Sequence, residues 1–389
     1  MKFFHLSDLH IGKCLNGYSL KENQEEVFRQ IVEAARQYRP DAILICGDVY
    51  DKSAPAAEAY TVFDHFLSEL AGIEPSIPVL IIAGNHDSPE RLNYASAFLE
   101  RHHIYLSVLP PEREEEYLKK IVLTDEYGPV NFYLLPFLKP GYVRGLMAEE
   151  RAGCTYEEAV SFVLKREKID REERNVLLSH QFYISGEDRP QVCDSEQPSL
   201  TVGGLDEIDI HVLEDFDYAA LGHLHGAQRV GQESVRYCGS PYKYSVSEER
   251  HEKAVTLVTL GEKGKEPEIQ YLPLHGLQDV RRERGTLEEI LRRGTEETRH
   301  DFVSVTVTDE RESFAMREQL EEVYDHLLEF HMDNDRVRKT LEETGEEIPV
   351  LRPYEAFCQF YQAVRHGAMS EEEEAVMKKI IEEAKEEDA

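Results

Sequence analysis

The chain has 389 residues, of which 41% are hydrophobic and 31% are charged, and its net charge is −33 at pH 7. A chain of this length is too long for one compact core and suggests about two or three domains. Its longest aliphatic runs are far too short to span a membrane. The negative charge argues against nucleic-acid binding, although local patches and bound cations set the field where a substrate sits.

The chain start and the cysteines bear on the compartment. The opening MKFFHLSDLHIG meets His5 and Asp8 early, so we expect no signal-peptide core there. Six cysteines are scattered without a C-x-x-C pair, which fits reduced thiols better than a zinc site or a disulfide framework. These features predict a cytoplasmic protein that has no membrane segment.

The first 140 residues alternate between strand and helix patterns. Aliphatic strands are expected at residues 2–7, 41–48 and 77–84, and amphipathic helices at residues 22–38, 58–71 and 88–103. Ser88 is the expected N-cap of the last helix, with Pro89 in its first turn. Alternation of this kind indicates a buried, largely parallel sheet.

A second group of strands follows this alternating region. Residues 119–137 read as a hairpin that turns at residues 127–128, and helices are expected at residues 141–150 and 155–168. Further strands are expected at residues 175–180, 217–223, 234–238, 254–260 and 267–274. We therefore predict a two-sheet α/β sandwich flanked by helices over residues 1–275.

The remainder of the chain divides into two smaller parts. Residues 276–343 read as strand, helix, strand, helix and strand, which predicts a small α/β capping domain. Residues 350–389 predict a pair of helices, each with an apolar stripe: Tyr354, Phe357 and Tyr361 on the first, Val376 and Ile380 on the second. Two short helices cannot bury these stripes alone, so they would dock on the main body or on a partner.

Polar side chains gather where the predicted strands end. The positions are Asp8, His10, Asp48, Asn85, His86, Asp87, His180, His223 and His225. In a sheet of this kind the strand ends meet at one crevice, and the i, i+2 spacing of Asp8 and His10 points both side chains the same way. Carboxylate, imidazole and amide donors suit manganese or iron. Without His86 and Asp87 the positions supply seven donors, a number that suits two ions sharing a bridging carboxylate.

Each signal is weak when it is taken alone. A single histidine is more often a core or surface residue than a ligand, and GDVYD could simply end a strand. His5 and His65 have no polar company and are expected to be structural. Five motifs that all fall at strand ends leave coincidence a poor explanation.

The motifs DLH, GDVYD, GNHD, SHQ and GHLH, in that order, resemble the signature of the calcineurin-like metallophosphoesterases. SLTVGG at 199–204, RYCGSPYKYSVSE at 236–248 and the C-terminal units extend the resemblance to the SbcD nuclease subunits. It implies that Asp8, His10 and His225 hold one ion, that Asn85, His180 and His223 hold the other, and that Asp48 bridges them. It also implies that His86 faces the substrate phosphate, with Asp87 orienting the imidazole.

One position departs from part of the family. Archaeal and eukaryotic relatives carry a second histidine shortly after the bridging Asp, where this chain has Asp51. Bacterial relatives resemble this chain at that point. The resemblance therefore carries no catalytic role to Asp51, which would support His86 or line the cleft.

The resemblance implies a manganese-dependent DNA nuclease that acts in DNA repair, recombination and replication. The implied activities are 3′-to-5′ exonuclease on duplex ends and endonuclease on single strands and hairpins. The implied partner is an SbcC-type ATPase gripped by the terminal helices, with a homodimer inside a heterotetramer. The basic run Arg281, Arg282 and Arg284 is either a solvated face or a DNA contact.

Two other functions compete with the nuclease. A small-molecule phosphodiesterase or protein phosphatase could use the same metal core, but would not need the capping domain or the apolar terminal helices. A non-catalytic scaffold could keep the metals for stability alone, but would not require His86 and Asp87.

Overall fold

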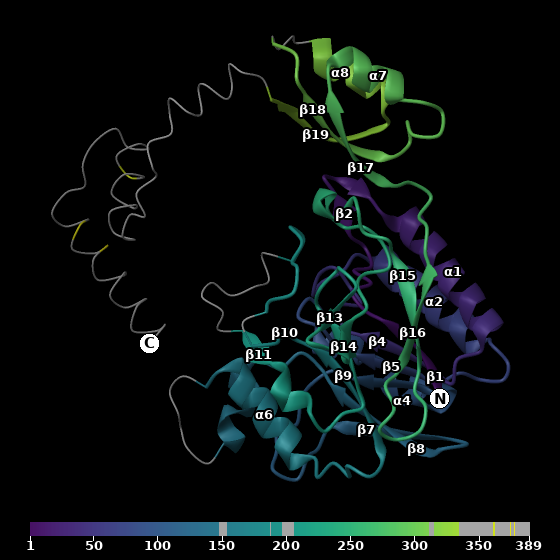
Figure 1. Cartoon of the computed structure of the whole chain (residues 1–389), viewed down its shortest axis with the longest axis vertical. Helices are drawn as coiled ribbons and strands as arrows, with labels where there is room; N and C mark the ends of the chain where they lie inside the picture. The colour runs from purple at the N-terminus through teal and green to yellow at the C-terminus, as the bar shows by residue number, and fades with distance from the viewer. Residues whose placement is uncertain are drawn as a thin grey trace.

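The structure is a computed structural model that describes residues 1–147, 154–186, 188–196, 206–310 and 315–333, together with Tyr361, Glu374 and Met377. Its centre is a pair of six-stranded sheets (Figure 1). The first sheet has the order β16-β15-β1-β4-β5-β6. Its strands are β1 (Lys2–Leu6), β4 (Ala42–Cys46), β5 (Val79–Ile82), β6 (Ile104–Ser107), β15 (Ala254–Thr259) and β16 (Glu268–Pro273).

The second sheet has the order β13-β14-β12-β9-β8-β7. Its strands are β7 (Lys119–Asp125), β8 (Gly128–Leu135), β9 (Arg174–His180), β12 (Tyr218–Gly222), β13 (Gln228–Val230) and β14 (Gln232–Tyr237). Both sheets are mixed: the central strands run parallel, whereas β7, β13, β15 and β16 pair in the antiparallel sense. The predicted two-sheet sandwich is confirmed.

Helices cover the outer face of each sheet. α1 (Lys21–Tyr38) and α2 (Ala57–Ala71) share a core with the first sheet, and α6 (Tyr156–Arg166) shares one with the second. Along β4, Ile43 and Ile45 belong to the helix-side core, whereas Leu44 and Cys46 belong to the core between the sheets. Because successive side chains along a strand point to opposite faces, one face of β4 packs against the helices and the other packs against the second sheet.

Shorter elements fill the connections between these strands and helices. They are β2 (Cys14–Leu15), β3 (Tyr18–Ser19), α5 (Pro140–Val143), η2 (Arg144–Leu146), β10 (Phe182–Ile184), β11 (Glu207–Asp209), η4 (Ile210–Leu213) and η5 (Val246–Glu248). The short strands among them were not predicted, because two or three residues are too few for an alternating pattern to be recognised.

The helix predicted over residues 88–103 is wrong as a single element. α3 (Pro89–Leu92) begins as expected, with the Ser88 hydroxyl accepting from the Arg91 N–H at 3.4 Å. Ala95 then takes a left-handed conformation at φ 60°, which separates α3 from α4 (Ser96–Leu99) and η1 (Glu100–His102). A left-handed residue cannot continue a right-handed helix, and alanine gives no sequence signal for it.

The capping unit stands at one end of the molecule (Figure 1). Its elements are β17 (Val280–Gly285), α7 (Leu287–Arg293), β18 (Phe302–Val307), α8 (Ala315–Val323) and β19 (His326–Met332). The three strands are parallel and pack with both helices around their own core. This small parallel-sheet unit is also confirmed, while the exact domain boundaries remain predictions.

The capping unit is attached to the sandwich by hydrogen bonds and by apolar contacts. The Asn16 amide donates to the Leu328 carbonyl at 3.0 Å, and the Asn23 amide donates to Gln278 at 2.6 Å. Phe302 and Leu328 join the core beneath α1 and α2. Across the described residues, no helix combines the length and the apolarity needed to cross a membrane.

Candidate metal centre

The loops that follow β1 and β4 run side by side at the edge between the sheets. The Asp8 N–H donates to the Gly47 carbonyl at 3.0 Å, and the His10 N–H donates to the Asp48 carbonyl at 2.9 Å. Asp8, His10 and Asp48 all have positive φ angles, of 52°, 43° and 48°. Non-glycine residues pay for this conformation, which is typical of positions where a functional site fixes the backbone.

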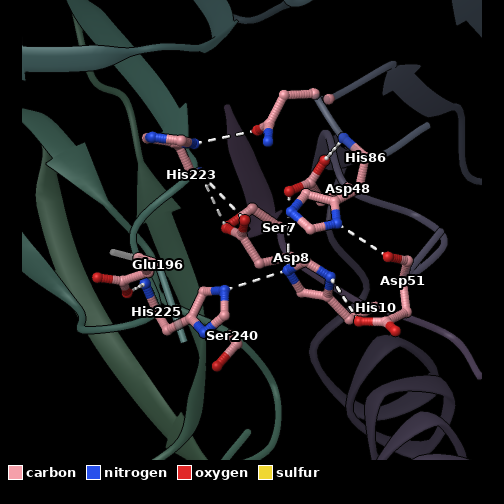
Figure 2. Close-up of polar contacts among 12 residues, drawn as sticks. Ser7, Asp8, His10, Asp48, Asp51, His86, Glu196, His223, His225 and Ser240 are labelled. Carbon is pink, nitrogen blue, oxygen red and sulfur yellow. Dashed lines mark hydrogen bonds and ion pairs between the residues drawn. The ribbon is translucent and has the colours of Figure 1, made fainter. Parts of the chain in front are cut away.

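The first donor group contains Asp8, His10 and His225 (Figure 2). One possible ligand atom from each lies within 4.8 Å of the others. The Nε2 atoms of His10 and His225 face each other at 3.1 Å. Asp8 is fully buried, and its carboxylate accepts from the Ser7 hydroxyl and from the His223 N–H.

The second donor group contains Asn85, His180 and His223. The Asn85 Oδ1 atom lies 3.0 Å from His180 Nε2 and 3.1 Å from His223 Nδ1. His180 Nδ1 donates to the Cys46 carbonyl at 2.7 Å, so the lone pair of this ring is on Nε2.

Asp48 lies between the two groups. Its Oδ2 atom is 3.3 Å from His180 Nε2 and 3.7 Å from His10 Nε2. This is the position that a bridging carboxylate would need. The structure thus brings together all seven side chains that the sequence proposed as ligands.

The charges of these groups fit bound cations. Asp8 and Asp48 are buried, and within the described part of the chain neither forms an ion pair with lysine or arginine. Burial raises the pKa of Asp8 and lowers the pKa of His10 well below its usual value. Burial opposes ionisation of Asp48 as well, but the facing His180 outweighs it and holds the pKa of Asp48 well below the ordinary value. Buried carboxylates that face imidazoles, with no lysine or arginine among their described partners, form a donor set for divalent metals.

His86 lies beside this donor set. Its backbone N–H donates to Asp48 Oδ1 at 2.8 Å, and its ring meets the His10 ring edge to face at 4.9 Å. The ring Nδ1 donates to the backbone carbonyl of Asp51 at 2.8 Å (Figure 2). The Nδ1 partner is therefore a main-chain carbonyl, where the sequence predicted the carboxylate of Asp87.

Asp87 holds two loops together. Its carboxylate accepts hydrogen bonds from the backbone N–H groups of Val49 at 3.1 Å, Tyr50 at 2.9 Å and Gly84 at 2.9 Å. The bonds from Val49 and Tyr50 fasten the loop after β5 to the loop after β4, whereas the bond from Gly84 lies within the loop after β5. The carboxylate thus bonds the backbone of these loops, while Nδ1 of His86 bonds the Asp51 carbonyl, and the orienting role of Asp87 stays a prediction.

Asp51 also makes an ion pair across the site. Its Oδ1 atom is 2.8 Å from the Lys13 ammonium and 3.6 Å from His10 Nδ1. His10, Asp51 and His86 form a third cluster of possible ligands. The ammonium of Lys13 already neutralises the carboxylate of Asp51, so this cluster is a poor candidate for the site of a third ion.

Two glycines make room for the donors. A Cβ atom on Gly47 would overlap the His180 ring, and a Cβ atom on Gly84 would overlap the Asp48 carboxylate. Gly47 also has φ 90°, a conformation that L residues rarely adopt. Glycine is therefore required at residue 47 of GDVYD and residue 84 of GNHD, because the donor side chains lie too close to leave space for a Cβ atom.

Three residues around His225 were missed by sequence reasoning. The Ser195 hydroxyl is 2.9 Å from His225 Nδ1, Glu196 accepts the His225 N–H, and Glu248 lies 3.5 Å from Nδ1. They come from loops far from the GHLH motif in sequence. The only available signal was the YSVSE segment, which the family resemblance included without a role for its glutamate.

The predicted DNA-contact and partner-binding residues lie outside this centre. On β17, Arg281 pairs with Asp301 and Glu283, and Arg284 pairs with Asp333, whereas the side chain of Arg282 is exposed. Of Tyr361 the structure describes only a helical, half-buried position. The other predicted partner residues fall outside the described part of the chain: Tyr354, Phe357, Val376 and Ile380.

Two donor groups that share a carboxylate, at the edge of a two-sheet α/β sandwich, define a metal-dependent phosphoesterase. The comparisons agree with this class. The calcineurin-like phosphoesterase family matches residues 1–227, and the type 5 capsule protein repressor C-terminal domain matches residues 276–365. The chain is 32% identical to the SbcD subunit of the nuclease SbcCD from Staphylococcus epidermidis, over 75% of this chain and 74% of that protein. It is also 32% identical to the corresponding protein of Staphylococcus saprophyticus, over 75% and 73%.

The chain therefore belongs to the calcineurin-like phosphoesterases and, among them, to the SbcD nuclease subunits. A solved phosphopantetheinyl hydrolase from Mycobacterium tuberculosis aligns with 62% of this chain and 90% of its own. Its sequence identity is 15% and its TM-score is 0.33, so this likeness adds nothing to the assignment.

Proposed function

We propose that this chain is a manganese-dependent nuclease that hydrolyses phosphodiester bonds in DNA. The observation that carries the proposal is the pair of donor groups joined at Asp48, with His86 beside them. Membership of the SbcD nuclease subunits supports DNA as the substrate. We assign one ion to Asp8, His10 and His225, a second to Asn85, His180 and His223, and the bridging role to Asp48.

The side chains around the ions would each have a defined task. Divalent ions bound there would supply Lewis-acid stabilisation of the phosphoryl oxygens and activation of water. His86 would face the substrate through Nε2, because its Nδ1 donates to the Asp51 carbonyl. From Nε2 the ring would stabilise charge on the phosphate or give a proton to the leaving oxygen. Asp87 would keep the loop that bears His86 in place.

The substrates and the assembly belong to the same proposal. We propose 3′-to-5′ exonuclease action on duplex ends, endonuclease action on single strands and hairpins, and ATP control by an SbcC-type partner. The relatives are named as one subunit of the nuclease SbcCD, which supports such a partner. The apolar stripes predicted for residues 350–389 would bind it, and much of the DNA contact would then belong to the partner. The free thiols of the described cysteines fit a cytoplasmic location.

A homodimer within that assembly is supported by exposed aromatic side chains. Tyr94 is 83% exposed and Phe98 is 61% exposed, both in the segment of α3 and α4. Large exposed aromatic residues that lie close together are typical of interaction surfaces. We therefore propose that the dimer contact lies on the segment of α3 and α4.

The proposal is tested with the purified full chain, a labelled hairpin DNA and a small phosphodiester, each with and without manganese. We expect manganese-dependent cleavage of the DNA, and a loss of about 10²- to 10⁴-fold in His86→Ala, because the leaving oxygen would lose its acid. His65→Ala is the matched control, since His65 is an exposed histidine on α2.

Two results would contradict the nuclease. One is turnover of the small ester while DNA stays intact even after an SbcC-type ATPase is added, which would favour a generic phosphodiesterase. The other is equal activity of His86→Ala and His65→Ala, which would remove His86 from the reaction.

A further inference from the structure

A buried carboxylate lies behind the first donor group. Glu248, at the end of η5, is fully buried, and its Oε2 atom is 2.6 Å from the ammonium of Lys253. Its Oε1 atom accepts from the Ser245 hydroxyl at 3.0 Å and from the Tyr244 N–H at 3.2 Å. Lys253 is also buried, so the pair keeps a charged carboxylate at a position where an isolated charge would be costly.

This pair and its neighbours hold His225 at three points. The His225 N–H donates to Glu196, and the His225 carbonyl accepts from the Lys253 ammonium at 2.9 Å. The ring Nδ1 faces the Ser195 hydroxyl at 2.9 Å, and that hydroxyl donates to Glu248 at 2.9 Å. Backbone and ring of this one residue are thus fixed by side chains from two separate loops.

The chain of hydrogen bonds determines which ring nitrogen carries the proton. Because the Ser195 hydroxyl donates to Glu248, its oxygen is available to accept from His225 Nδ1. The proton of the neutral ring is therefore on Nδ1, and the lone pair on Nε2 points toward His10 and Asp8. This is the tautomer that a metal ligand needs.

In the second donor group, no glutamate among the described residues supports a histidine. His180 Nδ1 donates to a backbone carbonyl, that of Cys46, and His223 presents Nδ1 itself to Asn85. Among the contacts of the described residues, the glutamate-supported histidine is a feature of the first group alone. A change at Glu248 should therefore affect the two ions unequally.

We infer that Glu248, charged because Lys253 pairs with it, is a positioning residue that orients His225 for the first ion. The inference rests on the two-ion site of the proposed function and adds a residue that neither the motifs nor the comparisons assign. It states that affinity for one ion depends on a side chain that touches neither the ion nor the substrate. Partners of this kind typically contribute 10- to 100-fold, roughly, to metal affinity.

The test is a manganese titration of the full chain, followed by the electron paramagnetic resonance signal of free Mn²⁺. The wild type is expected to bind two ions. Glu248→Gln is expected to bind one ion with unchanged affinity and the other about 10- to 100-fold more weakly. Ser195→Ala, at a half-buried position, should weaken the same ion by a smaller factor.

The matched control is Glu283→Gln. Glu283 is also a buried carboxylate in an ion pair, with Arg293 at 2.9 Å, but it belongs to the capping unit. This control should bind both ions as the wild type does, even if its melting temperature falls. It separates a loss of stability from a loss of ligand orientation.

Several outcomes would overturn the inference. Equal weakening of both ions in Glu248→Gln would mean a general structural role, and unchanged affinities would mean none. If Glu248→Gln does not fold, Ser195→Ala decides, because wild-type affinity for both ions would show that the hydrogen-bond chain does not orient His225. A wild type that binds no second ion would instead contradict the proposed function, which is a distinguishable result.

Discussion

Asp51 uses its main chain and its side chain for different purposes. Its carbonyl accepts from His86 Nδ1, while its carboxylate pairs with Lys13 at 2.8 Å. Lys13 follows the loop that carries His10, so the ion pair joins that loop to the loop of Asp48. Asp51 thereby anchors the ring of the residue that we propose as the acid.

This arrangement predicts that Lys13 matters for the reaction without binding a metal. In Lys13→Met the carboxylate of Asp51 loses its partner, and the carbonyl that fixes His86 should shift. We expect kcat on the small phosphodiester to fall by about 10- to 100-fold, since small misplacements of a catalytic group have effects of this size. Steady-state kinetics at saturating manganese would measure it.

The comparison needs two further variants. Lys52→Met is the control, because Lys52 is an exposed lysine next to Asp51, and it should retain wild-type kcat. The double variant Lys13→Met with Asp51→Asn should lose little more than either single variant, because both remove one interaction. Fully additive losses would show that the two side chains act independently.

At the scale of elements, the donors depend on how closely the strand ends approach one another. Gly84 lies in the loop between β5 and Asn85, and a Cβ atom on it would overlap the Asp48 carboxylate. The same loop is tied to the loop after β4 by two amide bonds to Asp87, those from Val49 and Tyr50. A side chain at residue 84 would therefore push apart the two loops that carry the bridging carboxylate and His86.

We predict that Gly84→Ala loses about 100-fold or more in manganese-dependent cleavage, because Asp48 would move away from both donor groups. Its melting temperature should also fall, which thermal unfolding by circular dichroism would detect. Gly141→Ala is the matched control, since a Cβ there meets no atom within 4 Å. Wild-type activity in Gly84→Ala would mean that the carboxylate can relax, and would contradict the close-approach argument.

The elements also show which parts of the site could be predicted from sequence. The donors at strand ends were predictable, because parallel strands send their carboxyl ends to one edge. The i, i+2 argument for Asp8 and His10 does not apply, since both residues have positive φ angles and are not extended. His5, also on β1, was expected to be structural, and its ring indeed bonds Tyr218 and a backbone carbonyl between the sheets. Ser195 lies in a turn and Glu248 in the three-residue η5, both too short for periodicity to show, so only the three-dimensional structure could bring them to His225.

On the scale of the whole molecule, the net charge of −33 requires that any DNA contact be local. The capping unit offers one exposed cation where it meets the sandwich. The Arg282 N–H donates to Glu249 at 3.1 Å, which places this residue next to the segment that supports His225. Its neighbours Arg281 and Arg284 are engaged in ion pairs, whereas no ion pair of the Arg282 guanidinium occurs among the described residues.

We therefore predict that Arg282 contacts a backbone phosphate of the DNA strand that enters the metal centre. Arg282→Ala should weaken DNA binding to a similar degree for different sequences. It should also reduce the slope of log K against log salt by about one, because one phosphate contact releases about one counterion. Fluorescence anisotropy of a labelled hairpin at several salt concentrations, with calcium replacing manganese to prevent cleavage, would measure both effects.

Arg292→Ala is the control for this experiment. Arg292 is also exposed on the capping unit, but its guanidinium pairs with Glu288 within α7 at 2.5 Å. Removal of this arginine changes the net charge by the same amount as removal of Arg282. If both variants alter the salt slope equally, the effect is one of overall charge, and the junction between cap and sandwich makes no specific contact. If only Arg282→Ala alters the salt slope, the DNA backbone lies over that junction, close to the segment that supports His225.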